Sequence, residues 1–124
     1  MTEIDELEGK ELAEAVATAI GMTKPVSSSG HAWFDTAGEM WTIADKDLGL
    51  RALYRPDLDI TQAWELDGDG WRWEFGEREQ YLSARVRTRY KIKFALVYWN
   101  DFSTKAHAYA TARCRAFLEA METE

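Results

Sequence analysis

The 124-residue chain has 46% hydrophobic residues, including six Trp, five Tyr and five Phe, enough to build one domain over residues 1–124 without disulfides or a structural metal. Its formal net charge of −7 disfavours long-range attraction to nucleic acid, and its single cysteine, Cys114, excludes an intramolecular disulfide. The acidic start does not resemble a signal peptide, and no apolar run approaches the ~20 residues of a membrane span. These features predict a cytoplasmic protein with no membrane partner.

The first predicted element is a helix over residues 7–21. Leu12, Val16 and Ile20 recur every four residues, and Gly21 stands where a glycine ends many helices. Carboxylates at its start suit the positive end of the helix dipole, so an ordinary solvated surface is the favoured interpretation. The alternative is an acidic face that imitates nucleic-acid phosphates and blocks an enzyme. The residues of this candidate acidic face are Glu3, Glu6, Glu8, Glu11 and Glu14.

Two short strands and a short helix are predicted next. Residues 31–35 and 40–44 have strand composition, and turn-forming residues lie between them. Asp59 is the expected N-cap of a helix over residues 60–66. In that helix Trp64 is expected to pack against the sheet.

Strand patterns fill the next part of the chain. Trp71, Trp73 and Phe75 alternate with charged residues, which is typical of a half-buried strand. Residues 80–99 contain no Gly, Pro, Asn or Asp, and most of them are strand-forming or charged residues. Because this segment is too long for one flat strand, we expect a hairpin or a sharp bend near residues 88–90.

The most prominent surface feature is a run of alternating basic residues within that segment. If the segment stays extended, five cations line one face at spacings of about 6.7 Å. A structural or solvated face is the favoured interpretation, followed by an acidic protein partner and then by nucleic-acid phosphates. With two aromatic residues farther along, the stripe forms the candidate binding surface, which comprises Arg85, Arg87, Arg89, Lys91, Lys93, Tyr98 and Trp99.

A second long helix is predicted over residues 103–121. Its inner stripe is expected to comprise Ala106, Ala110, Arg113 or Cys114, Phe117 and Met121. Long helices at both ends with strands between them indicate an α+β domain. We expect a mainly antiparallel sheet covered by the N- and C-terminal helices, similar to an αβα sandwich.

The sequence contains no recognisable catalytic, metal or cofactor motif. His31 and His107 have no second strong ligand at metal-binding spacing. Cys114 is expected to be a small buried hydrophobic residue rather than a nucleophile. Residues 65–70 contain the start of a calcium-loop pattern without its closing Glu, so an acidic turn is expected there.

Three stretches together resemble a family of small phage and prophage proteins, the phage ABA-sandwich domain family. They are residues 9–22 (GKELAEAVATAIGM), residues 59–64 (DITQAW) and residues 112–116 (ARCRA), in that order. Leu58 stands where the family pattern has Thr. The resemblance implies helices on both faces of a central sheet and a phage or prophage origin. It implies no catalytic residues.

The sequence thus favours a non-enzymatic accessory protein that binds another macromolecule in a bacterial host cell. The expected partner is a host or phage protein, and inhibition of a bacterial defence complex, as by anti-CRISPR proteins, is one specific version. A small enzyme or ligand-binding domain is the first alternative. A weak nucleic-acid binder that uses residues 85–93 is the second. The oligomeric state is left open.

Overall fold

The computed structural model describes residues 4, 7–24, 32–44 and 52–122 of the chain, and it confirms a small α+β domain with antiparallel sheets. The long helices are α1 (Gly9–Ala19) and α3 (Lys105–Glu122), and α2 (Ile60–Trp64) is short. The strands are β1 (Ala32–Phe34), β2 (Met40–Thr42), β3 (Arg72–Glu77), β4 (Tyr81–Arg87) and β5 (Ile92–Tyr98), and a 3-10 turn, η2 (Trp99–Asp101), follows β5. No described helix combines the length and the apolar character needed to cross a bilayer.

Local signals place the ends of the helices. Gly21 has a φ of +94°, and its N–H and that of Met22 bond to the carbonyls of Thr18 and Ala17, which is a Schellman ending for α1. Asp59 caps α2, because its carboxylate accepts the backbone N–H groups of residues 61 and 62. Both endings were predicted and are confirmed.

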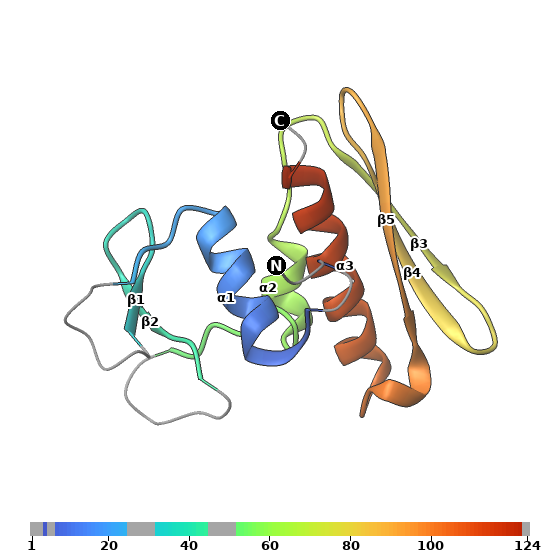
Figure 1. The fold of residues 1–124 in the computed structure, drawn as a ribbon, viewed down its shortest axis with the longest axis horizontal. Coiled ribbons are helices and arrows are strands. Elements are labelled where there is room, and N and C mark those ends of the chain that lie inside the picture. The colour runs from blue at the N-terminus through green and yellow to red at the C-terminus, as the bar shows by residue number, and fades with distance from the viewer. Residues whose placement is uncertain (1–3, 5–6, 25–31, 45–51, 123–124) are drawn as a thin grey trace.

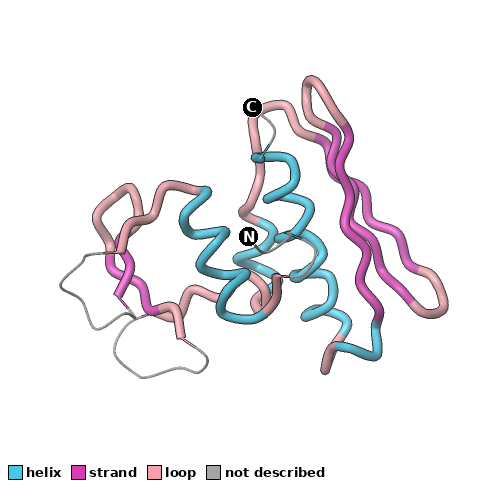
Figure 2. The backbone as a smooth tube through the Cα atoms, viewed as in Figure 1, coloured by secondary structure: helices cyan, strands magenta, loops and turns pink. Residues whose placement is uncertain are grey.

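The helices lie between two sheets. In Figure 1 the β1–β2 hairpin lies on one side of α1, and the three-stranded sheet, in the order β3-β4-β5, lies beyond α3. Figure 2 shows the same sequence of layers by type of element. The layer order therefore differs from a central sheet with helices on both faces. The reason is that the outward side chains of the three-stranded sheet include charged residues and stay exposed.

Helix α3 separates two groups of buried side chains. On the α1 side, Phe117 and Cys114 pack with large residues such as Leu12, Val16 and Ile43. On the sheet side, α3 presents a row of small residues at every fourth position, Ala108, Ala112, Ala116 and Ala120. Because this row is flat, the sheet can approach the helix closely. Ala106 and Met121, at the two ends of the predicted inner stripe, are exposed.

Helix α2 is attached to the rest of the domain by Arg113 of α3. The guanidinium donates to the carbonyl oxygens of Ala63, Trp64 and Leu66 at 2.7–3.1 Å, and it lies 3.9 Å from the ring centre of Trp73. Trp64 stacks on Phe75 of β3 with their ring centres 4.7 Å apart, as expected for a residue that packs this helix on the sheet. The carbonyl groups at the end of α2 are thus satisfied inside the protein.

Candidate functional site

The hairpin between β4 and β5 divides the predicted basic stripe between two faces of the sheet. Thr88 closes the turn, because its backbone N–H bonds to the carbonyl of Lys91 at 2.8 Å. Arg87 is paired with Ile92 across the strands, and paired residues point to the same side. Lys93 therefore points to the opposite side from Arg87. The ridge of five cations that an extended segment would give is not formed.

Arg85 and Arg87 remain together on the face of the sheet that is turned away from α3, which we call the outer face. Arg89 and Lys91 lie in the turn, where Arg89 is exposed. Tyr98 is on the outer face at the end of β5, and Trp99 follows it in η2. The structure thus brings three of the seven predicted surface residues, Arg85, Arg87 and Tyr98, to one face.

The outer face carries an apolar row that sequence reasoning missed. Every second residue of β5 points outward, and the exposed fractions of Ile92, Phe94, Leu96 and Tyr98 are 49%, 62%, 39% and 55%. Tyr81 of β4 is paired with Tyr98, and their ring centres are 6.3 Å apart. The sequence shows that alternate residues of 92–98 point to opposite faces of a strand. Which of the two sets points outward depends on the position of the turn, which the sequence does not give.

Arginines border this apolar row. Arg85 is paired with Phe94 and Arg87 with Ile92, and Arg72 of β3 is exposed on the same face. Glu74, also on β3, forms an ion pair with Arg85 at 2.6 Å. The outer face of β3 and β4 thus has three arginines against one glutamate, and it is positive on a protein whose net charge is −7.

The candidate acidic face falls partly within the described residues. Glu3 and Glu6 lie outside them. Glu8 is the exposed residue before α1 and makes no side-chain cap, Glu11 is exposed, and Glu14 is half-buried. The three described carboxylates thus lie on or beside α1, and the structure does not bring them together with the outer face.

The surroundings of Cys114 agree with the prediction that it is a small buried hydrophobic residue rather than a nucleophile. Its side chain is fully buried, and burial raises the pKa of the thiol well above its ordinary value. A thiol in this state is a poor nucleophile at neutral pH. His107 is half-buried with its ring 4.8 Å from that of Phe102, and burial lowers its pKa. His31 lies outside the described residues.

A metal site is not assembled by the described residues, since no group of three or more His, Cys, Asp or Glu side chains is placed to hold an ion. The acidic segment before β3 is a tight turn, as expected. Asp67 accepts hydrogen bonds from the Gly68 N–H at 2.8 Å and from the Trp73 indole at 3.0 Å. A side chain at Gly68 would collide with the ring of Trp71, so this turn requires glycine.

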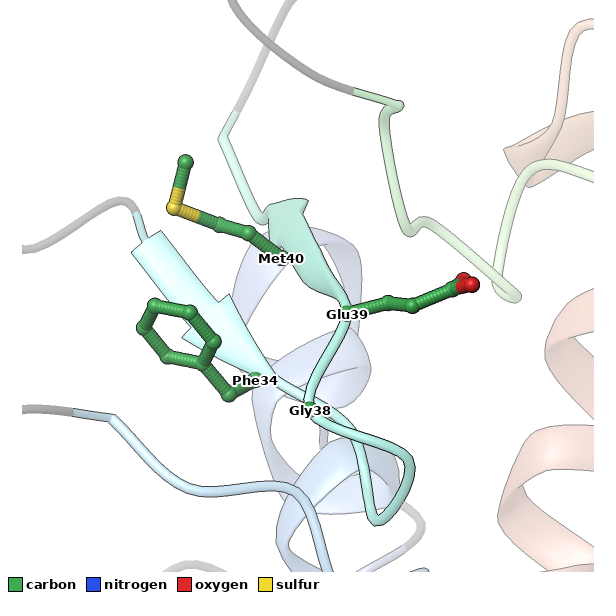
Figure 3. A pocket seen from close by; sticks show the side chains of 4 residues that line it. All are labelled: Phe34, Gly38, Glu39 and Met40. Carbon is green, nitrogen blue, oxygen red and sulfur yellow. The ribbon is translucent and has the colours of Figure 1, made fainter.

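A hollow of about 580 Å³ lies on the β1–β2 hairpin, shown in Figure 3. Phe34 and Met40 point to the same side of the hairpin there, whereas Glu39 points away from them. Gly38 forms the turn end of the hollow. One carboxylate and two apolar side chains do not form an acid–base or nucleophilic pair, so this hollow is not a candidate catalytic site.

Comparisons of the chain with protein-family models, with curated proteins and with solved structures find no match. The phage-family resemblance therefore stays a prediction. The outer face of the three-stranded sheet is the candidate functional site, because it combines exposed apolar and aromatic side chains with arginine.

Proposed function

We propose that this chain acts by binding another protein on the outer face of its three-stranded sheet. The observation that carries the proposal is the apolar row of β5, which comprises Ile92, Phe94, Leu96 and Tyr98. Exposed apolar side chains are ordinary when scattered, but a contiguous row bordered by polar residues is typical of an interaction site. Tyrosine and arginine, which flank this row, are also the residue types that contribute most to binding at protein interfaces.

The charge of the surface defines the partner. Three arginines against one glutamate on an acidic protein favour a partner surface with apolar side chains next to Asp or Glu. The phage origin implied by the sequence resemblance would make that partner a host or phage protein. Inhibition of a bacterial defence complex is then one form that the activity takes.

Single-stranded nucleic acid is the competing partner, since bases stack on exposed aromatic rings beside arginines. Three observations favour protein. Ile92 and Leu96 have no ring on which a base could stack, the guanidinium of Arg85 is paired with a carboxylate, and the net charge of −7 repels a polyanion.

The test compares two leucines of equal exposure. Leu96 of the outer face and Leu58, which precedes α2, are both 39% exposed. A partner is first captured from bacterial lysate with the wild-type chain and purified. We expect this partner to bind Leu96→Ser and Phe94→Ser at least ~10-fold more weakly than the wild type. Leu58→Ser should bind as the wild type does. Calorimetry with the purified partner gives these affinities.

Three results would contradict the proposal. The first is equal weakening by Leu96→Ser and Leu58→Ser, which would indicate a general effect of an exposed serine. The second is a wild-type dimer in sedimentation that Leu96→Ser dissociates, since the surface would then join two copies of this chain. The third is tight, salt-dependent binding of a single-stranded oligonucleotide that Phe94→Ser abolishes.

A further inference from the structure

A second cavity lies away from the outer face, between the β1–β2 hairpin and the ends of α1 and α2. Its volume is about 260 Å³, which suits a ligand smaller than a drug-sized molecule. Five separate stretches of chain contribute its walls. The polar and aromatic residues of its lining include Asp35, Trp41, Tyr54, Gln62, Glu65 and Asp67.

Aromatic side chains form one part of the wall. Trp41 and Tyr54 meet edge to face with ring centres 5.7 Å apart, and Phe117 of α3 also lines the cavity. Tyr54 is held in place by the backbone, because its N–H bonds to the carbonyl of Thr42 at 2.8 Å. Aromatic faces attract cations through the negative potential above the ring.

Carboxylates form the other part, and two of them are fixed. Asp35 accepts the indole N–H of Trp41 at 3.0 Å and two backbone N–H groups of its turn, and these hydrogen bonds, that of Trp41 first, lower the pKa of Asp35. Asp67 is held by Gly68 and Trp73 through one oxygen. The side-chain carboxylate of Glu65 makes no hydrogen bond or ion pair with any described residue. Asp35 is therefore ionised at neutral pH, and two further acidic side chains line the same cavity.

The other polar groups of the lining do not neutralise these charges. The amide of Gln62 is used at both ends, since it accepts from the N–H of Arg55 and donates to the carbonyl of Leu53. The guanidinium of Arg113 acts on Asp67 electrostatically but is held on the carbonyl oxygens beyond it and does not line the cavity. Within the described lining there is no Lys, Arg or His.

Tyr54 supplies an independent indication of a ligand. Its side chain lines the cavity and is only 8% exposed, yet its hydroxyl makes no hydrogen bond with any described residue. Burial raises the pKa of Tyr54, and the carboxylate of Glu65, which lines the same cavity, adds to that effect. Because no described side chain or carbonyl occupies this hydroxyl, it can form a hydrogen bond with a ligand atom in the cavity.

We infer that this cavity binds a small organic cation with an alkylammonium head. The aromatic walls would contact the methyl or methylene groups around the nitrogen, and Glu65 with Asp35 and Asp67 would balance its charge. A hydroxyl or amide near the head would pair with Tyr54. A bare metal ion fits less well, because the described carboxylates are not grouped to coordinate one. The same head occurs in free amines and in the lysine side chain of a protein.

The probes are choline and its neutral isostere 3,3-dimethyl-1-butanol, which replaces the nitrogen by carbon. Each probe is titrated into the protein, and binding is followed by the indole N–H signal of Trp41 in NMR spectra. The signal is assigned by its absence from the spectrum of Trp41→Phe. We expect saturable binding of choline, with the isostere at least ~10-fold weaker. Glu65→Gln should weaken choline binding about three- to tenfold. Glu79→Gln, the same charge change in the distant β3–β4 turn, should leave it unchanged.

The inference fails if choline gives no saturable shift, if the isostere binds as tightly, or if Glu65→Gln and Glu79→Gln behave alike. Tyr54→Phe, which keeps the ring, should weaken choline more than it weakens tetramethylammonium, which lacks a hydroxyl. A capped trimethyl-lysine is the final probe. Binding tighter than choline assigns the head to a protein side chain, and weaker binding assigns it to a free amine. Outer-face variants such as Leu96→Ser should not change either affinity.

Discussion

The two sides of α3 are built from different kinds of side chain. Toward α1, Phe117 packs among large residues, and its ring centre lies 5.8 Å from that of Trp71. Toward the sheet, the helix has alanine at every fourth position, and Ala84 and Ala95 of the strands pack in the same cluster between larger residues. The first side fills volume with a few large groups, and the second brings two flat surfaces together.

This difference explains where the binding features lie. The close approach of the sheet to the alanine row of α3 leaves little room for large side chains between them. The large residues of β5 therefore lie on the outer face, where Phe94 is the most exposed of them. The large-residue side leaves gaps between rings that meet at angles, and the cavity beside Trp41 and Tyr54 is one of them. Each candidate site is thus a consequence of the packing on its own side of α3.

The largest effect on stability is expected from Phe117→Ala. Deleting this buried ring should lower the free energy of unfolding by about 3–5 kcal/mol, since it removes apolar contacts and leaves a cavity. Urea unfolding measures the change. Met121→Ala, on the same helix but 40% exposed, should cost much less. Equal losses at the two positions would contradict the view that the ring of Phe117 belongs to the apolar core on this side of α3.

The next largest effect is expected at Arg113, which joins the two sides. Arg113→Met keeps much of the length of the side chain but removes the guanidinium donor from the carbonyl groups of Trp64 and Leu66. The carbonyl of Ala63 also loses the guanidinium and keeps the backbone N–H of Leu66. We expect a loss of about 2–4 kcal/mol in the free energy of unfolding. Arg87→Met on the outer face should change it by less than about 0.5 kcal/mol. A small effect at Arg113 would mean that water replaces the guanidinium at the end of α2.

Features set by neighbouring residues could be predicted from the sequence. Gly21 ends α1 and Asp59 begins α2, because both act within one turn of the helix. The hairpin near residues 88–90 followed from strand length alone. The burial of Cys114 followed from its residue type and its place in the helix.

Features that depend on register or on distant segments could not be predicted. The basic stripe was divided because the turn at Thr88 sets which residues of β5 face outward. The sequence left open whether Arg113 or Cys114 belongs to the inner stripe, and only the position of α2 shows that both are buried and that Arg113 bonds to α2. The cavity is assembled from side chains as far apart as Asp35 and Phe117, whose proximity no local pattern encodes.

The smallest of the three effects on stability is expected from enlarging the alanine side. Ala116 is fully buried against the sheet, so Ala116→Leu should force the helix and strands apart and cost about 1–3 kcal/mol. Ala106→Leu is the matched control, because Ala106 is exposed at the start of α3 and tolerates a larger side chain. The opposite order, with Ala116→Leu neutral or stabilising, would show that this interface is loosely packed. The flat alanine row would then not explain why the large residues of β5 face outward, and the outer face would need another origin.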